Sequence, residues 1–334
     1  MLPPAFKVVT RSSRLALTDT MEVISALIQT TYKTTPYTFT IVPFDAIGDR
    51  ERERWQEFAA TAGEEVRKRK WTYDLEMAIV EGAVDIAVHS GKDLSFDTTP
   101  RTLVYPVCDR ADPRDIFIGL NVQRMADLPP GAKVGTNSLR RRAQILAMRP
   151  DLDVVPYGGN ITTRIDPNNM RLKNVDGIVI AAAGLQRMNM NNVAREYLAP
   201  LDFMPAVSQG ILAVQIHERD RELLEPVLQA TVDPATAAMW VAERELTHGL
   251  EAGCDSAIGG YAIVQGDQLR LYGRALAVDG SQSLTDSEVG PMADAEAIGR
   301  RLAQRMAAKG AKEIMQVGLE ALHATRNAAS TKRG

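Results

Sequence analysis

Short apolar runs alternate with amphipathic segments through the first two thirds of the chain. The runs predict buried strands, and the segments with helical spacing between them predict helices. The first pair is a strand over 6–10 followed by a helix from Ser13, a plausible N-cap, to about Thr30, with Leu17, Ile24, Leu27 and Ile28 on its inner face. Further strands are expected at 38–43, 86–88, 101–107, 113–120, 153–157, 177–181 and 211–216. This order predicts an α/β protein with repeated βα elements and a mostly parallel sheet.

The last third has a different pattern. A helix is expected over 234–250, with Gly253 as its C′ residue, followed by a hairpin over 261–277. Two amphipathic helices, at about 294–308 and 311–322, follow the hairpin. These elements predict a small α+β domain.

The segment Asp85–Leu94, DIAVHSGKDL, is the best candidate for chemistry. Its apolar strand stops in polar or permissive residues that include Lys92 and Asp93. In open α/β sheets, ligands bind beyond the carboxyl ends of strands. The lysine could hold an anionic substrate and the aspartate could stabilise a cation. The alternative is a strand that runs into a solvated turn.

A second candidate is VGTNSLRRRAQ. Thr136 and Ser138 occupy N-cap positions, and the first helical turn carries Arg140, Arg141 and Arg142. Cations at a helix N-terminus cost stability unless an anion lies among them. We therefore predict an anion-binding helix N-terminus.

Composition narrows the function classes. The chain has 334 residues, 45% of them hydrophobic and 24% charged, and a net charge of −3. These values are typical of a soluble globular protein of two or three domains and give no reason to expect nucleic-acid or membrane binding. With two distant cysteines, Cys108 and Cys254, and four histidines, we expect no disulfide framework, no metal and a cytoplasmic location. The charged stretch 48–70 is a solvated loop or short helix, and a candidate lid.

Nine motifs, taken in order, resemble the signatures of the porphobilinogen deaminases, also called hydroxymethylbilane synthases. They are RSSRLAL (11–17), GD (48–49), DIAVHSGKDL (85–94), DPRD (112–115), VGTNSLRRRAQ (134–144), GNITTR (159–164), AAAGLQR (181–187), PAVSQG (205–210) and LEAGCDSAIG (250–259). The resemblance implies two periplasmic-binding-protein-like lobes and a small α+β C-terminal domain. The implied boundaries are 1–106 with 206–228 for the first lobe, 107–205 for the second, and 229–334 for the third domain.

The resemblance also implies the chemistry. Cys254 would form a thioether to a dipyrromethane cofactor, which primes the condensation of four porphobilinogen molecules with loss of ammonia in tetrapyrrole and heme biosynthesis. The implied catalytic residues are Asp93 and Lys92. Each substrate becomes an azafulvene cation, so Asp93 would stabilise developing positive charge, while Lys92 would help to bind the acidic groups of the substrate. Cys108 would be structural. The protein would be a monomer whose partner is a small pyrrole. The residues expected to hold the cofactor and substrate are Arg11, Ser13, Ser90, Thr136, Ser138, Arg140, Arg141, Arg164, Arg187 and Gln209.

Several positions depart from the family pattern near the chemistry. The family usually has Arg at Gly158, Gln at Asp19, Lys and Glu at Tyr73 and Asp74, a bulky apolar residue at Gly91 and Gly at Ser208. The cleft should therefore be less positive than is usual. Three hypotheses follow: a working deaminase, a paralogue that joins a modified pyrrole or fewer units, and a non-catalytic binding protein. The last would need neither Asp93 nor Cys254.

Overall fold

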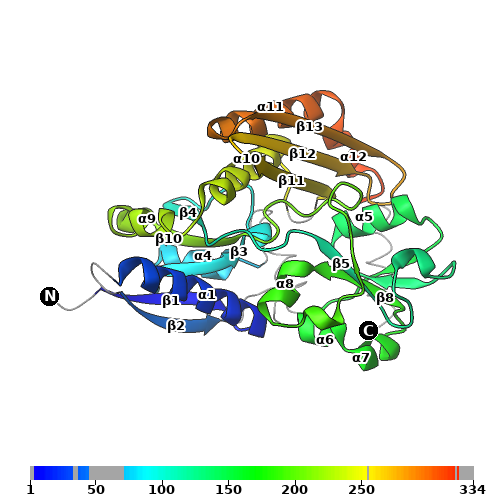
Figure 1. The fold of residues 1–334 in the computed structure, drawn as a ribbon, viewed down its shortest axis with the longest axis horizontal. Coiled ribbons are helices and arrows are strands. Elements are labelled where there is room, and N and C mark those ends of the chain that lie inside the picture. Colours follow the sequence, from blue (N-terminus) through cyan, green and yellow to red (C-terminus); the bar gives the residue numbers. More distant parts are fainter. Residues whose placement is uncertain (1–3, 33–36, 45–70, 254–255, 320–321, 323–334) are drawn as a thin grey trace.

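In the computed structural model, which describes residues 4–32, 37–44, 71–253, 256–319 and 322, three β-sheets lie in three parts of the chain. Figure 1 shows the first lobe on the left, the second on the right and the C-terminal domain above both. The predicted lid and Cys254 lie outside the described residues. No helix among the described residues is long and apolar enough to cross a membrane.

The first sheet has the strand order β2-β1-β3-β10-β4. Its strand β10 runs antiparallel to β3 and β4, while β1 pairs in parallel with β2 and β3. Because β10 comes about a hundred residues after β4, the chain returns to this sheet after building the second lobe. The elements are β1 (Ala5–Arg11), β2 (Thr38–Phe44), β3 (Ile86–Ser90), β4 (Thr102–Val107), β10 (Leu212–His217), α1 (Arg14–Thr31), α4 (Tyr73–Val80) and α9 (Arg221–Gln229).

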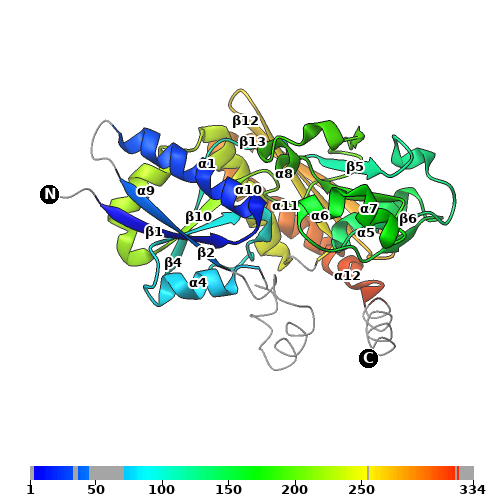
Figure 2. The same ribbon diagram turned by 90° about the horizontal axis from the view of Figure 1, so that it is seen from below.

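Strand alternation assigns the two faces of this sheet. Ile86 and Val88 of β3 pack in the same apolar cluster as residues of α1 and α9, whereas Ala87 packs with Leu75 and Ile79 of α4. Figure 2 shows α1 and α4 on opposite sides of the strands. The sheet is thus covered on both faces, as parallel strands require.

The second sheet repeats this arrangement with the order β7-β6-β8-β5-β9. Here β5 is the antiparallel strand, paired with β8. The predicted mostly parallel sheet is confirmed in both lobes. The elements are β5 (Asp115–Gly119), β6 (Lys133–Gly135), β7 (Asp153–Val155), β8 (Gly177–Ala181), β9 (Glu196–Tyr197), α5 (Leu139–Met148), α6 (Ile161–Ile165), α7 (Pro167–Leu172) and α8 (Ala182–Arg187).

The C-terminal domain packs two long helices on a three-stranded antiparallel sheet. The hairpin prediction is confirmed, but the sequence did not predict β13, because its residues SLTDSEVGP are mostly polar and lie at the sheet edge. The elements are α10 (Pro234–Leu250), β11 (Ile258–Gln265), β12 (Gln268–Leu276), β13 (Ser283–Pro291), α11 (Ala295–Ala308) and α12 (Ala311–Gln316). Short 3-10 helices lie at η2 (Gly91–Asp93), η3 (Met125–Asp127), η4 (Asn191–Val193), η5 (Glu218–Asp220) and η6 (Met292–Asp294).

Three details of the helix predictions were wrong. Ile28 is 41% exposed, because the buried face of α1 runs through Val23, Ile24 and Leu27 instead. The left-handed residue after α10 is Glu251, with φ +54°, and not Gly253. Helix α12 ends at Gln316, where a turn at Val317 and Gly318 interrupts the single helix predicted to about 322, although Leu319 and Leu322 are helical again.

A buried ion pair ties the three parts together. Glu243 of α10, whose side chain is fully buried, lies 2.7 Å from the Arg110 guanidinium. Its carboxylate also accepts hydrogen bonds from the backbone N–H groups of Ser208, in the returning segment, and Ala262, in β11. With three donors on one carboxylate, the charge is fully compensated. This contact fixes α10 against the junction of the lobes.

Candidate active site

A cleft of about 410 Å³ lies where the two lobes and the C-terminal domain meet. Its lining includes each of the site residues expected from the sequence, apart from Cys254, which lies outside the described part of the chain. Gly253 and Ser256, on either side of the undescribed pair 254–255, also line it. The cleft therefore brings together residues that are spread over some 200 positions of sequence.

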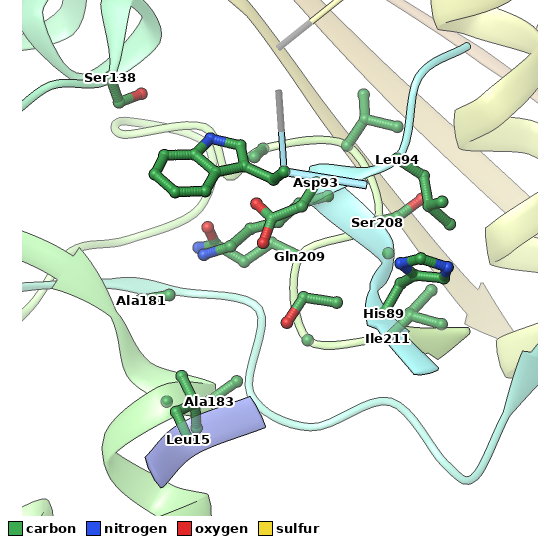
Figure 3. A pocket seen from close by; sticks show the side chains of 18 of the residues that line it. Leu15, His89, Asp93, Leu94, Ser138, Ala181, Ala183, Ser208, Gln209 and Ile211 are labelled. Carbon is green, nitrogen blue, oxygen red and sulfur yellow. The ribbon is translucent and has the colours of Figure 1, made fainter. Parts of the chain in front are cut away.

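The predicted catalytic pair follows β3, as expected. The chain turns at η2, where the Gly91 N–H donates to the Ile211 carbonyl of the neighbouring returning segment at 2.8 Å. Figure 3 shows the carboxyl group of Asp93 directed away from β3 toward the second lobe, from which Ser138 and Ala181 come. Asp93 thus presents a carboxylate to the cleft from a backbone that is tied to the sheet.

Lys92 lies beside Asp93 and is half-buried. Burial, reinforced by nearby Arg141, lowers the pKa of Lys92 to about 8, although Asp93 acts in the opposite direction. The ammonium is therefore held in a site that favours an added anion.

Arg164 contributes a half-buried cation from α6. Burial lowers its pKa to about 10, and Arg141 and Arg11 act in the same direction, while Asp93 raises it. Its Nε is buried and has no hydrogen-bond partner among the described residues. A buried donor that is unsatisfied within the protein is a natural partner for an acidic ligand group. Arg11, at the end of β1, lies with its guanidinium 4.5 Å from the centre of the Trp71 ring.

The arginines at the start of α5 have a protein anion between them. The Asp115 carboxylate lies 2.7 Å from Arg140 and 2.8 Å from Arg141, and Gln209 donates to the same carboxylate at 3.0 Å. Burial alone would raise the pKa of Asp115, but the two guanidinium groups hold it well below its usual range. The N-cap prediction for Ser138 is confirmed, since its Oγ accepts from the Arg141 N–H. The anion that compensates this helix start is thus Asp115.

Arg187, the last residue of α8, reaches across the cleft to α1 of the first lobe. Its Nε lies 3.1 Å from a Glu22 oxygen and 3.6 Å from Asp19 Oδ1, and its Nη2 donates to the Gly210 carbonyl. Burial raises the pKa of Asp19 to about 6. Asp19 Oδ1 is buried and makes no hydrogen bond to a described residue. Two carboxylates therefore share this guanidinium.

The departures from the family pattern have distinct structural settings. Gly158 is exposed at the cleft, and the left-handed φ of +113° belongs to its neighbour Gly159. At Gly91, a Cβ would lie 2.7 Å from the Trp240 ring, so the space is already filled. Ser208 adopts a φ of +58°, a conformation that suits glycine. Tyr73 begins α4 and does not line the cleft.

Sequence reasoning did not select Trp71, Asn137 or Arg244, all of which line the cleft. Asn137 lies between two residues that were selected, and that proximity was a usable signal. Arg244 lies on α10 in a different domain, and no local pattern connects it to the cleft.

The fold and the cleft define a two-lobed α/β protein with a cationic site for an acidic small molecule. Comparison with known proteins identifies the family. Residues 6–225 match the family model "Porphobilinogen deaminase, dipyromethane cofactor binding domain", and residues 237–308 match "Porphobilinogen deaminase, C-terminal domain". The chain belongs to the porphobilinogen deaminase family, whose members are transferases.

Individual relatives cover most of the chain. Porphobilinogen deaminase of Alkaliphilus metalliredigens is 34% identical over 310 residues, which are 93% of this chain and 94% of that protein. The Thermus thermophilus protein of the same name is 38% identical over 307 residues, 92% of this chain and 96% of the relative. Among solved structures, a nutrient binding protein from Burkholderia cenocepacia bound to methionine is 11% identical, with a TM-score of 0.40, over 67% of this chain and 90% of that one.

Proposed function

We propose that this chain joins porphobilinogen molecules head to tail, four in succession, with loss of ammonia from each. The observation that carries the proposal is the cleft in which a single turn presents Lys92 and Asp93 together with Arg164, whose buried Nε has no hydrogen-bond partner among the described residues. Porphobilinogen carries two carboxylates and forms a cation as its ammonia leaves. The cleft offers guanidinium groups that can bind the substrate carboxylates and a carboxylate that can stabilise the cation.

The residues present fit an acidic pyrrole cofactor. Arg164 Nε is a buried donor that lacks a partner among the described residues, and the cleft beside it extends to Gly253, which directly precedes Cys254. We propose that Cys254 anchors the dipyrromethane, and that Arg11, Ser13, Thr136, Ser138 and Arg164 hold its acidic groups. When bound, the cofactor supplies the pyrrole carbon that attacks the activated substrate.

The roles of the other residues follow from their positions. Asp93 faces the cleft, and its carboxylate would stabilise positive charge on a pyrrole nitrogen and move a proton there. Lys92 would hold a substrate carboxylate. Arg140 and Arg141 have Asp115 between them, so we propose that they preserve the shape and positive potential of this wall, with Gln209 fixed to the same carboxylate. Ser90 donates to Asp19 at 3.3 Å and would orient that carboxylate.

We also propose the domain boundaries 1–106 with 206–228, 107–205 and 229–334. Because one chain supplies every described wall of the cleft, a monomer would suffice for catalysis. A scarcity of cysteine supports a cytoplasmic location.

The proposal is tested by incubating the purified protein with porphobilinogen and measuring ammonia release and formation of the linear tetrapyrrole. Release of four ammonia molecules per product supports it. Absence of both from a protein that carries the pyrrole adduct on Cys254 would contradict it.

A second candidate function is condensation of a less acidic pyrrole. It is favoured by the two carboxylates on Arg187 and by the missing side chain at Gly158. A higher kcat/KM for a pyrrole that lacks one carboxylate than for porphobilinogen would select it.

A further inference from the structure

Helix α10 of the C-terminal domain lies along the segment that carries Lys92 and Asp93. Trp240, Arg244 and His248 are spaced four residues apart and therefore share one face of the helix. Arg244 Nη2 donates to the carbonyls of Ser95 at 2.8 Å and Phe96 at 3.2 Å. The His248 ring meets the Phe96 ring edge to face, with centroids 6.2 Å apart.

Trp240 makes the contact nearest to the catalytic pair. Its side chain is 5% exposed and packs with Leu94 and Ile211 in one apolar cluster. A Cβ built on Gly91 would lie 2.7 Å from Cζ3 of the indole, closer than real Cβ atoms approach. The indole therefore fills the volume that a side chain at position 91 would take. Figure 3 shows Leu94, Ser208 and Ile211 on the opposite side of Asp93 from Ser138 and Ala181.

Ser208 completes this packing. The Cβ built on Gly91 would lie 3.1 Å from the Ser208 Cβ, and Ser208 has a left-handed φ of +58°. The Ser208 Oγ is buried without a hydrogen-bond partner in the described structure. The left-handed backbone and the unpartnered hydroxyl both make serine unfavourable at position 208. Its Cβ nevertheless packs against Gly91, where no side chain is present. Positions 91, 208 and 240 thus form one packing unit beneath the catalytic turn.

We propose that Trp240 is a positioning residue for the reaction: it replaces a side chain at position 91 and fixes the turn that presents Asp93. This inference rests on the proposed function for the role of Asp93. Because α10 ends three residues before Gly253, the same helix links the turn with Asp93 to the segment that leads into Cys254. The Asp93 carboxylate and Gly253 would therefore keep a fixed separation.

The test compares four variants with wild type under conditions where all are folded and carry the cofactor, as verified by intact mass. Trp240→Val should lower kcat about tenfold and change KM less than twofold, because the cleft arginines are untouched. A combined variant, Trp240→Val with Gly91→Met and Ser208→Gly, should regain kcat to within about threefold of wild type. Leu246→Ala is the matched control, since Leu246 is also a buried residue of α10 but packs in the C-terminal core. It should lower the Tm and leave kcat unchanged.

The inference is overturned if Trp240→Val keeps kcat within twofold of wild type, if Leu246→Ala loses as much kcat, or if the combined variant regains nothing. Wild-type protein that releases no ammonia from porphobilinogen would instead contradict the proposed function. In that case the Tm values test whether positions 91, 208 and 240 form one packing unit. Trp240→Val and Gly91→Met should each lower the Tm by several degrees, and the combined variant should regain the wild-type Tm. A combined variant whose Tm falls by the sum of the separate losses would overturn the packing unit.

Discussion

Asp19 Oδ1 lies 3.6 Å from Arg187 Nε, across the cleft between α1 and α8. Glu22 engages the same guanidinium at 3.1 Å, so a substrate carboxylate that approaches Arg187 meets two competing carboxylates. This arrangement bears directly on substrate choice, because an acidic pyrrole needs guanidinium groups that are available to it.

Asp19→Gln should therefore lower the KM for porphobilinogen, by about tenfold if one buried like charge is worth about 1.4 kcal/mol. Glu22→Gln is the control: its side chain is 39% exposed, so solvent screens its charge and the effect should be smaller. Steady-state kinetics at pH 7.5 would measure both. A higher KM for Asp19→Gln would mean that the carboxylate helps to bind the substrate.

The same residue should affect stability in a defined pH window. Burial raises the pKa of Asp19 from 3.8 to about 6, with Arg187 acting against it. Between these values the folded state holds the proton more tightly than the unfolded state, so wild-type protein loses stability as pH rises through this window. Asp19→Asn has no proton to lose there. It should be more stable at pH 7, by on the order of 2 kcal/mol, and equal to wild type near pH 3.5. Urea unfolding at both pH values would check this; no gain at pH 7 would show that the ion pair with Arg187 outweighs burial.

Asp93→Asn should nearly abolish turnover while the fold and the cofactor are retained. Removal of a fixed charge that opposes a developing cation costs on the order of 3 kcal/mol, which is about a hundredfold in rate. The control is Asp85→Asn at the start of the same strand, where the carboxylate accepts the Lys7 N–H at 2.7 Å. An amide oxygen can accept that hydrogen bond, so kcat should not change. Turnover of Asp93→Asn within a few-fold of wild type would remove Asp93 from the mechanism.

Gly158→Arg should tighten porphobilinogen binding by about 1.5–3 kcal/mol, since it adds a guanidinium at the cleft. Gly158→Ala should be harmless, because its Cβ would meet only the amide end of the Asn137 side chain, which can rotate away. Gly159→Ala should destabilise the protein, because its φ is +113°. Binding to each variant can be measured by calorimetry with catalytically impaired Asp93→Asn protein. Weaker binding to the Arg variant, with the Ala variant unaffected, would assign the space at Gly158 to a bulkier or less acidic substrate.

The sequence predicted most elements of the fold because apolar periodicity and N-caps are local properties. Ser13 and Ser138 were assigned as N-caps and both side chains accept backbone N–H groups. Strand β13 was not predicted, because an edge strand needs few apolar residues.

The sequence predicted which residues line the site, but not which of them pair with one another. Three arginines at the start of α5 indicated an anion, yet the partner Asp115 depends on how β5 pairs with β8. Likewise, the sequence shows that position 91 lacks the bulky side chain usual in the family, but not what takes its place. The space is filled by Trp240, which lies about 150 residues later and reaches it through domain packing.

The central claim is that the protein condenses pyrroles on a pyrrole cofactor attached to Cys254. The intact mass of the protein tests this claim most directly. Protein expressed in a host that makes porphobilinogen should carry an adduct of two condensed pyrrole units. Cys254→Ser should lose the adduct, whereas Cys108→Ser should keep it, because Cys108 packs beside the apolar core of the first lobe. An unmodified wild-type mass, or an adduct that persists in Cys254→Ser, would contradict the account.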